Sequence, residues 1–316
     1  MKTLEQMGEL EILSRLTRRL PGRGDVIVGA GDDCAVVRPP ARKSDDLLLK
    51  SDPVVEGVHF KPDTPARDVG RKALARVLSD IAAMGGTPLW VLVNLVAPGN
   101  TPWARVEGIR RGFARLARRH GVAWAGGDIS AGPVLELHVF CVGRAPRGKS
   151  VLRSGAKPGD AIYVTGTLGG SILGKHLRFE PRLAQGQWLR AEHWASAMLD
   201  LSDGLAIDLL RLARASRCGA EIWPDHFPIS QALRKSGCGR QLIKHALGDG
   251  EDYELLFTVA DAKVPEFEAA WRRRFSLRCT RIGRIAGGRA GRVVLVQAGR
   301  ARRIIKDGGY EHFAVP

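Results

Sequence analysis

The chain has 316 residues, of which 44% are hydrophobic and 26% charged, and its formal net charge is +16. This length suffices for two domains or for one large one. No apolar stretch approaches the roughly 20 residues that span a bilayer, and the N-terminus has no cleavable apolar core. The five cysteines are scattered and form no Cys-x-x-Cys pair, which argues against zinc and against a disulfide framework. We therefore expect a cytoplasmic protein with free thiols and no membrane association.

The positive charge has two interpretations. A basic protein can bind nucleic acid or another polyanion. However, the arginines are spread along helical segments such as residues 105–120, and there is no recognition motif or basic tail. A solvated helix face explains this pattern, so nucleic acid is not expected as a partner.

In chain order, the pattern predicts a helix near residues 8–20 and strands at about 33–37 and 46–51. A helix over 66–84 follows Pro65 and ends at two glycines, as start and stop signals indicate. The other elements expected in this half are a strand at 88–96, a helix at 103–119, and strands at 122–126 and 134–144.

The stretch 143–160 is rich in Gly, Pro and Arg, which is typical of a connection between domains. Strands mixed with helices of 15 or more residues indicate an α/β or α+β fold, and the predicted domains are residues 1–148 and 149–316. Beyond the connection we expect a strand in "AIYVTG" (161–166), helices through the 170s to 190s, a helix at 204–217, and strands near 220–223, 253–259 and 292–297.

The acidic residues gather in short clusters beside Gly or Ser, each next to an apolar run, where ligands of α/β proteins collect. Oxygen ligands without a matching Cys or His set select Mg²⁺ over zinc or copper. Several carboxylates suggest several Mg²⁺ ions between two phosphorylated molecules, which indicates phosphoryl transfer. The clusters contain Asp32 and Asp33, Asp52, Asp80, Asp128, Asp200 and Asp203, and Glu251, Asp252 and Glu254.

Asp80 is the sharpest individual case. In "ALARVLSDIAAMGG" it lies three residues after Val77 and four before Met84, so it shares the apolar stripe of a helix. It also lies in the C-terminal half of that helix, where the dipole disfavours an anion. A carboxylate placed against both preferences indicates a cation ligand, although a solvent-facing Asp at the edge of the stripe would give the same pattern.

One motif resembles a phosphate-binding loop. "GGSILGKH" (169–176) follows a predicted strand and matches Gly-x-x-x-x-Gly-Lys. However, His176 replaces the Ser or Thr whose hydroxyl would hold Mg²⁺, and no strand ending in a lone Asp follows at a suitable distance. We therefore do not expect a P-loop.

Taken in order, the motifs resemble those of the thiamine-monophosphate kinases, in the superfamily of aminoimidazole ribonucleotide synthetase. The resemblance runs from "GELEIL" (8–13) to "GGYEHF" (308–313), and its most specific parts are "SDPVVEGVHF" (51–60) and "GEDYELLF" (250–257). It implies Mg²⁺- and ATP-dependent phosphorylation of thiamine monophosphate to thiamine diphosphate. It also implies the PurM-like fold of two α/β domains, in a homodimer whose N-terminal domains join into a β-barrel.

The resemblance implies roles for single residues. Asp80, Asp128 and Arg153 would be catalytic, and ATP would contact Gly127, Asp128, Arg153 and Ser202. Thiamine monophosphate would face His59, Glu251 and Tyr310, with His59 donating to its phosphate and Tyr310 stacking on a ring. The Mg²⁺ ligands would be Asp32, Ser51, Asp52, Asp80, Asp128, Asp200 and Asp203.

Two positions depart from the family pattern. Lys50 stands two residues before Asp52, where Ser or Thr is usual, so that one Mg²⁺ position is weakened or the ammonium takes over part of its charge. Asp249 stands where Gly or Ser is common. Because of these two departures, the number of bound metal ions does not follow from the resemblance. The expected reaction is the same.

The implied acceptor is a phosphate monoester with a second pKa of about 6, so it is largely a dianion at neutral pH. It needs no general base, and the task is to neutralise charge, in which Arg153 could assist. Two alternatives stay open: another ATP-dependent synthetase of the superfamily, of the purine or selenophosphate type, and a non-catalytic protein that binds polyanions.

Overall fold

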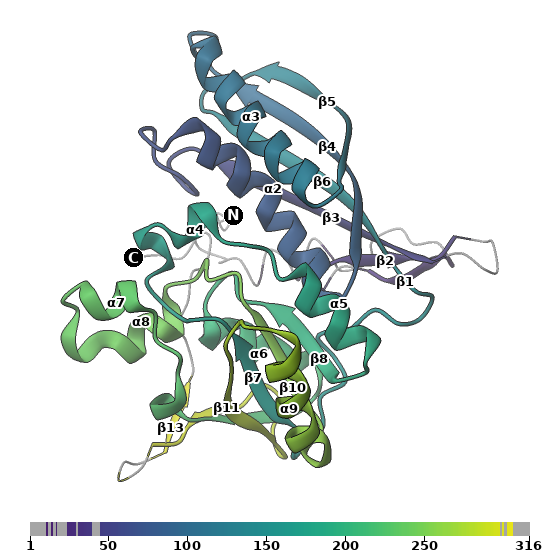
Figure 1. Cartoon of the computed structure of the whole chain (residues 1–316), viewed down its shortest axis with the longest axis vertical. Coiled ribbons are helices and arrows are strands. Elements are labelled where there is room, and N and C mark those ends of the chain that lie inside the picture. The colour runs from purple at the N-terminus through teal and green to yellow at the C-terminus, as the bar shows by residue number, and fades with distance from the viewer. Residues whose placement is uncertain are drawn as a thin grey trace.

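The structure is a computed structural model. It describes residues 24–29, 31–39, 45–297, 299 and 302–305, together with Glu11, Ser14 and Thr17. Most of the helix expected near 8–20 lies outside these residues, and so does Tyr310. The described chain forms two sheets, one of six strands and one of seven, which lie one above the other in Figure 1. No helix in the described part is both long and apolar enough to cross a membrane.

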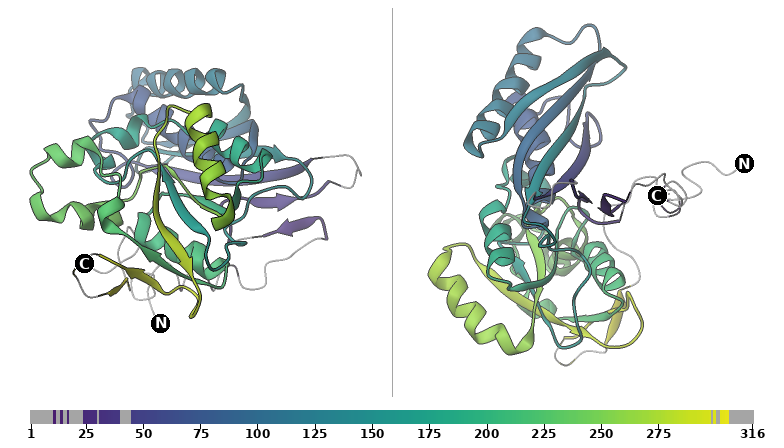
Figure 2. Two further views of the ribbon diagram at one scale, coloured as in Figure 1. Left: turned by 60° about the horizontal axis from the view of Figure 1, so that its bottom comes forward. Right: turned by 90° about the vertical axis from the view of Figure 1, so that its right-hand side faces the viewer.

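The first sheet has the strand order β1-β2-β3-β6-β4-β5. Helices α2 (Ala66–Ala83) and α3 (Trp103–Arg119) cover one face of it (Figure 2). These two helices approach closely because Gly112 has no side chain: a Cβ there would lie 1.9 Å from the carbonyl oxygen of Arg67. The strands are β1 (Val26–Val28), β2 (Ala35–Val37), β3 (Asp46–Val55), β4 (Thr87–Ala97), β5 (Ala123–Ala131) and β6 (Glu136–Ala145).

Alternation along β3 decides which side chains reach the site. Leu48 and Val54 are fully buried on the face under α2, and Lys50 and Asp52 share that face because side chains alternate along a strand. Ser51 points to the opposite, open face, opposite Phe140 of β6. The first sheet therefore has one face built into the protein interior and one face without a covering layer in the described chain.

The second sheet has the order β13-β12-β9-β11-β7-β10-β8. Its strands β7 and β10 are buried along their whole length. The strands are β7 (Ala161–Thr165), β8 (Ala195–Asp200), β9 (Gly219–Ile222), β10 (Leu255–Val259), β11 (Cys279–Ala286), β12 (Val293–Leu295) and β13 (Arg303–Ile305). The helices of this half are α4 (Lys175–Arg178), α5 (Leu183–Ala191), α6 (Leu205–Ala215), α7 (Gln231–Lys235), α8 (Leu242–Gly248) and α9 (Val264–Arg274).

The element prediction is confirmed for five of the six strands of the first sheet and for its two helices, with ends that differ by a few residues, and it misses β1. In the second half it is wrong for β8, which lies where helices were expected, and it misses β11, β13, α7, α8 and α9. A short run such as "ASAMLD" (195–200), buried at its end, has no periodicity that separates a strand from a helix. The sequence pattern therefore predicted the mixture of helices and strands, but it did not identify every strand.

Candidate active site

Three carboxylates from distant parts of the chain meet between the two sheets. Asp33 precedes β2, Asp80 lies on α2 and Asp200 ends β8, and each offers an oxygen within 4.8 Å of the other two. All three are buried. The hydroxyl of Ser79 donates a 2.5 Å hydrogen bond to Asp200. We name Asp33, Asp80 and Asp200 the carboxylate cluster.

The cluster holds more negative charge than its partners neutralise. Burial raises the pKa of Asp80 well above its usual range, and the neighbouring carboxylates raise it further, against the effect of Lys50. Burial, with repulsion from Asp33, raises the pKa of Asp200 to about 7. The Oδ2 atom of Asp33 is buried and has no hydrogen-bond partner among the described residues. Buried oxygens that lack a partner are costly, and this donor set fits a hard cation such as Mg²⁺.

Two cationic side chains lie beside Asp52, next to the cluster. The ammonium of Lys50 lies 2.9 Å from Oδ1 of Asp80 and 3.5 Å from Oδ1 of Asp52. Burial disfavours this ammonium, but the two carboxylates outweigh burial and raise the pKa of Lys50. Arg76 of α2 approaches Asp52 from the other side, with 3.8 Å from its Nε to Oδ2.

Arg76 was missed by the sequence analysis. Its Nε and Nη1 atoms are buried and have no hydrogen-bond partner among the described residues. A buried guanidinium with free donors beside a ligand site suits an anionic ligand such as a phosphate. The available signal was its spacing, since Arg76 lies four residues before Asp80 and therefore on the same helix face.

Arg153 joins the predicted residues to the cluster. Its Nη2 donates to Oδ1 of Asp33 at 2.7 Å, and its backbone N–H donates to Oδ2 of Asp32 at 3.1 Å. Burial, with repulsion from Asp33, raises the pKa of Asp32 to about 6. The structure thus places Asp32 next to the cluster, while Asp33, which was not among the predicted ligands, contributes the cluster oxygen.

A second group of polar residues surrounds the buried ammonium of Lys72 on α2. The ammonium of Lys72 donates to Glu251 at 2.7 Å and to the carbonyl of His59 at 2.5 Å, and it lies 3.0 Å from Nδ1 of His176. Although burial acts to raise it, the pKa of Glu251 falls to about 2 because His176 and Lys72 stabilise the carboxylate. The predicted residues His59 and Glu251 are therefore brought together, by a lysine that sequence reasoning missed.

The loop that carries Glu251 has an unusual backbone. Glu251 and Tyr253 have φ angles of +53° and +49°, in the left-handed region that non-glycine residues rarely adopt. The ring of Tyr253 stacks on Phe179 with 4.0 Å between centroids. Such conformations are held at functional sites by surrounding contacts.

Several predicted residues do not join the cluster in the single chain. Asp203 forms an ion pair with Arg211 of α6. The strand register places Asp128 beside Asn94, on the open face of the first sheet that also carries Ser51. Gly127 lies beside Asp128 in β5.

Ser202 also lies outside the cluster, in the turn that follows β8. Its backbone N–H donates to Asp208 at 3.1 Å. That contact helps to fix the turn.

The other acids of the "GEDYE" motif are structural. Glu254 is buried and pairs with Lys175 at 2.8 Å and Arg182 at 2.7 Å, and Asp252 accepts from the backbone N–H of Gly169. Lys175 therefore has a carboxylate partner, and the helix after the glycine-rich loop, α4, covers only Lys175–Arg178. That "GGSILGKH" is no P-loop therefore stays a prediction, and the pairing of Lys175 with Glu254 is in line with it.

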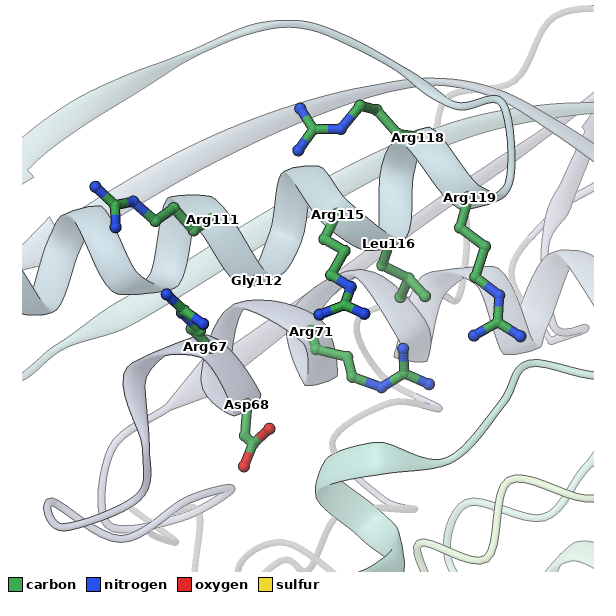
Figure 3. Close-up of a pocket in the computed structure, with 9 residues that line it drawn as sticks. All are labelled: Arg67, Asp68, Arg71, Arg111, Gly112, Arg115, Leu116, Arg118 and Arg119. Carbon is green, nitrogen blue, oxygen red and sulfur yellow. The ribbon is translucent and has the colours of Figure 1, made fainter.

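The excess positive charge gathers elsewhere. A cavity of about 370 Å³ between α2 and α3 has one acid in its lining, Asp68, and Figure 3 shows the arginine side chains around it. Arg67 at its edge lies about 20 Å along the axis of α2 from Asp80, at 1.5 Å per residue. The arginines are Arg67, Arg71, Arg111, Arg115, Arg118 and Arg119.

The fold and the cluster place the chain among the AIR synthase related proteins. Residues 31–145 match the family model of their N-terminal domain, and residues 173–296 match that of their C-terminal domain. The chain is 38% identical over 309 residues to the thiamine-monophosphate kinase of Rhodopirellula baltica, which covers 95% of each sequence. It is 36% identical over 340 residues to that of Salmonella typhimurium, with 98% of this chain and 99% of the relative covered. The chain belongs to the thiamine-monophosphate kinase family.

Solved structures agree with this result. A structure described as "AaThiL complexed with AMPPCP and TMP" is 30% identical to the chain, with a TM-score of 0.84 and 99% of both chains covered. The resemblance stated from the motifs is thereby confirmed.

Proposed function

We propose that this protein transfers the γ-phosphoryl group of ATP to thiamine monophosphate, which yields thiamine diphosphate and ADP. Full-length similarity to thiamine-monophosphate kinases and to a structure named for its complex with AMPPCP and TMP supports this reaction. The observation that carries the proposal is the carboxylate cluster between the two sheets. It brings three buried acids together, and one of their oxygens has no hydrogen-bond partner among the described residues.

Asp33, Asp80 and Asp200 are the residues that would hold Mg²⁺, with Asp32 and Asp52 beside them. Bound there, Mg²⁺ would offset the negative charge of the phosphate oxygens and hold the two substrates in line. Ser79 orients Asp200 through its hydrogen bond.

The two arginines supply fixed positive charge for the transferred group. Arg153 and Arg76 each have buried donor atoms without a partner among the described residues, and they approach Asp33 and Asp52 respectively. Charge-assisted hydrogen bonds from such donors stabilise phosphoryl oxygens in the transition state. The acceptor phosphate attacks with its own oxygen, so the chain needs to orient it and remove no proton.

His59 and Glu251 would contact the thiamine phosphate. Their shared contact with Lys72 sets the distance between "EGVHF" and "GEDYELLF", which are the most specific motifs of the chain. Tyr310, predicted to stack on a ring of this substrate, stays a prediction.

A homodimer would complete the site. The open face of the first sheet exposes Trp90, Leu92 and Phe140, and a contiguous apolar patch of this kind marks an interface. If a second copy packed on this face, the six-stranded sheets of the two copies would together close into a β-barrel. Asp128 and Gly127 would then lie in the subunit interface. We further propose the domain boundaries 1–148 and 149–316. The two sheets and the two separate family-model matches support a division into two domains.

The test is an assay of the purified chain with ATP, Mg²⁺ and, in parallel, thiamine monophosphate, thiamine and aminoimidazole precursors. Thiamine diphosphate should form only from thiamine monophosphate and only with Mg²⁺. Asp80→Asn should reduce turnover by at least about a thousandfold, because the loss of one catalytic residue has effects of this order. The circular dichroism spectrum of the variant should stay unchanged. Turnover of an aminoimidazole precursor would instead support the synthetase alternative. Salt-sensitive polyanion binding without turnover would support the non-catalytic one.

A further inference from the structure

Lys50 lies where a metal ion would be expected. It points from β3 to the face under α2, two residues before Asp52, so both side chains face the carboxylate cluster. Its ammonium contacts carboxylates from two elements, Asp80 of α2 and Asp52 of its own strand. A single positive charge thus links two acids that were both predicted to be Mg²⁺ ligands.

The geometry leaves no room for Mg²⁺ between the same two carboxylates. Mg²⁺ binds carboxylate oxygens at about 2.0–2.1 Å and needs six ligands in octahedral arrangement. The Nζ atom is 2.9 Å from the Asp80 oxygen, in a site where the Lys50 side chain is only 22% exposed. An ion bound to both oxygens would have to displace the ammonium into a site with little solvent.

Arg76 reinforces this arrangement. Its Nε lies 3.8 Å from Oδ2 of Asp52, while Lys50 contacts Oδ1 of the same carboxylate. Asp52 is therefore enclosed by two cations that belong to the protein. The carboxylate cluster differs from Asp52 in this respect, because one of its oxygens, Oδ2 of Asp33, has no hydrogen-bond partner among the described residues.

We propose that Lys50 is a built-in cation that replaces one divalent ion, so that metal binding is confined to the side of the site formed by Asp33, Asp80 and Asp200. Asp52 then serves as a counter-ion for Lys50 and Arg76 in this chain. The inference rests on the proposed function in one respect, namely that the cluster binds Mg²⁺.

The experiment counts metal ions directly. Mn²⁺, as a probe for Mg²⁺, is titrated into the full chain with the ATP analogue AMPPCP present, and free Mn²⁺ is measured by electron paramagnetic resonance. Lys50→Ser should bind one more Mn²⁺ per chain than the unmodified protein, and so should Lys50→Gln, whose amide oxygen can act as a ligand. Lys235→Met removes an exposed lysine on α7 and should leave the count unchanged.

A second readout is the melting temperature with and without Mn²⁺. Without metal, both Lys50 variants should melt below the unmodified protein because Asp52 and Asp80 lose a counter-ion. Mn²⁺ should raise their melting temperature by more than it raises that of the unmodified protein. Equal stoichiometry and equal metal-dependent shifts in the unmodified protein and both variants would overturn the proposal.

The outcome separates this inference from the proposed function. An unmodified protein that forms thiamine diphosphate, with Lys50 variants that gain no ion, overturns the role of Lys50 alone. An unmodified protein that binds no Mn²⁺ and forms no product overturns both.

Discussion

The hydroxyl of Ser79 on α2 donates a 2.5 Å hydrogen bond to the carboxylate of Asp200 at the end of β8, and so connects the two halves of the chain inside the candidate site. Both residues are buried, and Asp80, the next residue along α2, belongs to the same cluster. One helix therefore supplies a carboxylate and orients another that lies 121 positions away in the sequence.

Ser79→Ala tests this contact. The alanine removes the donor and leaves Asp200 free to rotate away from Asp33 and Asp80. Loss of a hydrogen bond that orients a metal ligand lowers metal affinity by roughly 10- to 100-fold. We expect the Mg²⁺ concentration for half-maximal activity to rise by that factor. The control is Ser236→Ala, whose hydroxyl donates to the carbonyl of Leu233 at the end of α7. An unchanged Mg²⁺ dependence in Ser79→Ala would contradict the orienting role.

Lys72 and Glu251 form a pair whose members depend on each other. Lys72 is fully buried, so Glu251→Gln leaves its ammonium without a charged partner. Breaking a buried pair from one side costs about 3–5 kcal/mol, and we expect about 3 kcal/mol because the Glu251 side chain is 24% exposed. The double variant Lys72→Met with Glu251→Gln should recover part of this loss. Urea denaturation of both single variants and the double variant measures the coupling, and strictly additive losses would refute it.

The sequence predicted the presence of the site better than its composition. Asp80 could be singled out because its place on a helix contradicts two preferences that are local to the helix. Asp32 and Asp33 are neighbours in the sequence, and Asp33 is the one that belongs to the cluster. Arg153 contacts Asp32 with its backbone and Asp33 with its side chain, from 121 and 120 positions away. Sequence spacing carries no information about a contact of that kind.

The residues that were missed share this cause. Lys72 lies among apolar residues on α2, and nothing local shows that Glu251, 179 positions later, supplies its counter-charge. β8 was missed because strand and helix are equally compatible with a short buried run. By contrast, α2 and α3 have clear signals at their ends and long periodic patterns, and they were predicted to within a residue or so.

Asp252 should give the stability a measurable pH dependence. Burial raises its pKa in the folded chain from 3.8 to about 7. The folded state therefore keeps a proton that the unfolded state releases, and stability falls as pH rises from about 4 through 7. Asp252→Asn keeps an oxygen that can accept from Gly169 and cannot titrate. Urea denaturation at pH 5 and pH 8 should show a smaller loss of stability at the higher pH for the variant. Parallel pH dependences would exclude this role for Asp252.

The proposed dimer predicts the effect of a charge on the open face. Leu92 is 44% exposed in the single chain, in register with Phe140. Leu92→Glu should produce a monomer in sedimentation experiments and lower the activity, because Asp128 would lose its place in the interface. Ile304→Glu adds the same charge at another exposed apolar position, on β13, and should leave the sedimentation coefficient unchanged. A monomeric unmodified protein with full activity would contradict the proposed dimer.

Gly127 combines a backbone requirement with a predicted contact to ATP. Its φ is +155°, and a Cβ at this position would lie 1.8 Å from the carbonyl oxygen of Val93 on β4. Gly127→Ala must therefore move β5 away from β4 and shift Asp128, the next residue, on the open face of the sheet. Strain of this kind costs about 1–3 kcal/mol. We expect a lower melting temperature together with a raised KM for ATP.

Gly99→Ala is the matched control, because a Cβ there would meet no atom within 4 Å. A Gly127→Ala variant that loses stability and keeps its KM for ATP would limit Gly127 to a structural role. Loss of ATP affinity in that variant alone would instead tie the close packing of β4 and β5 to the position of the nucleotide.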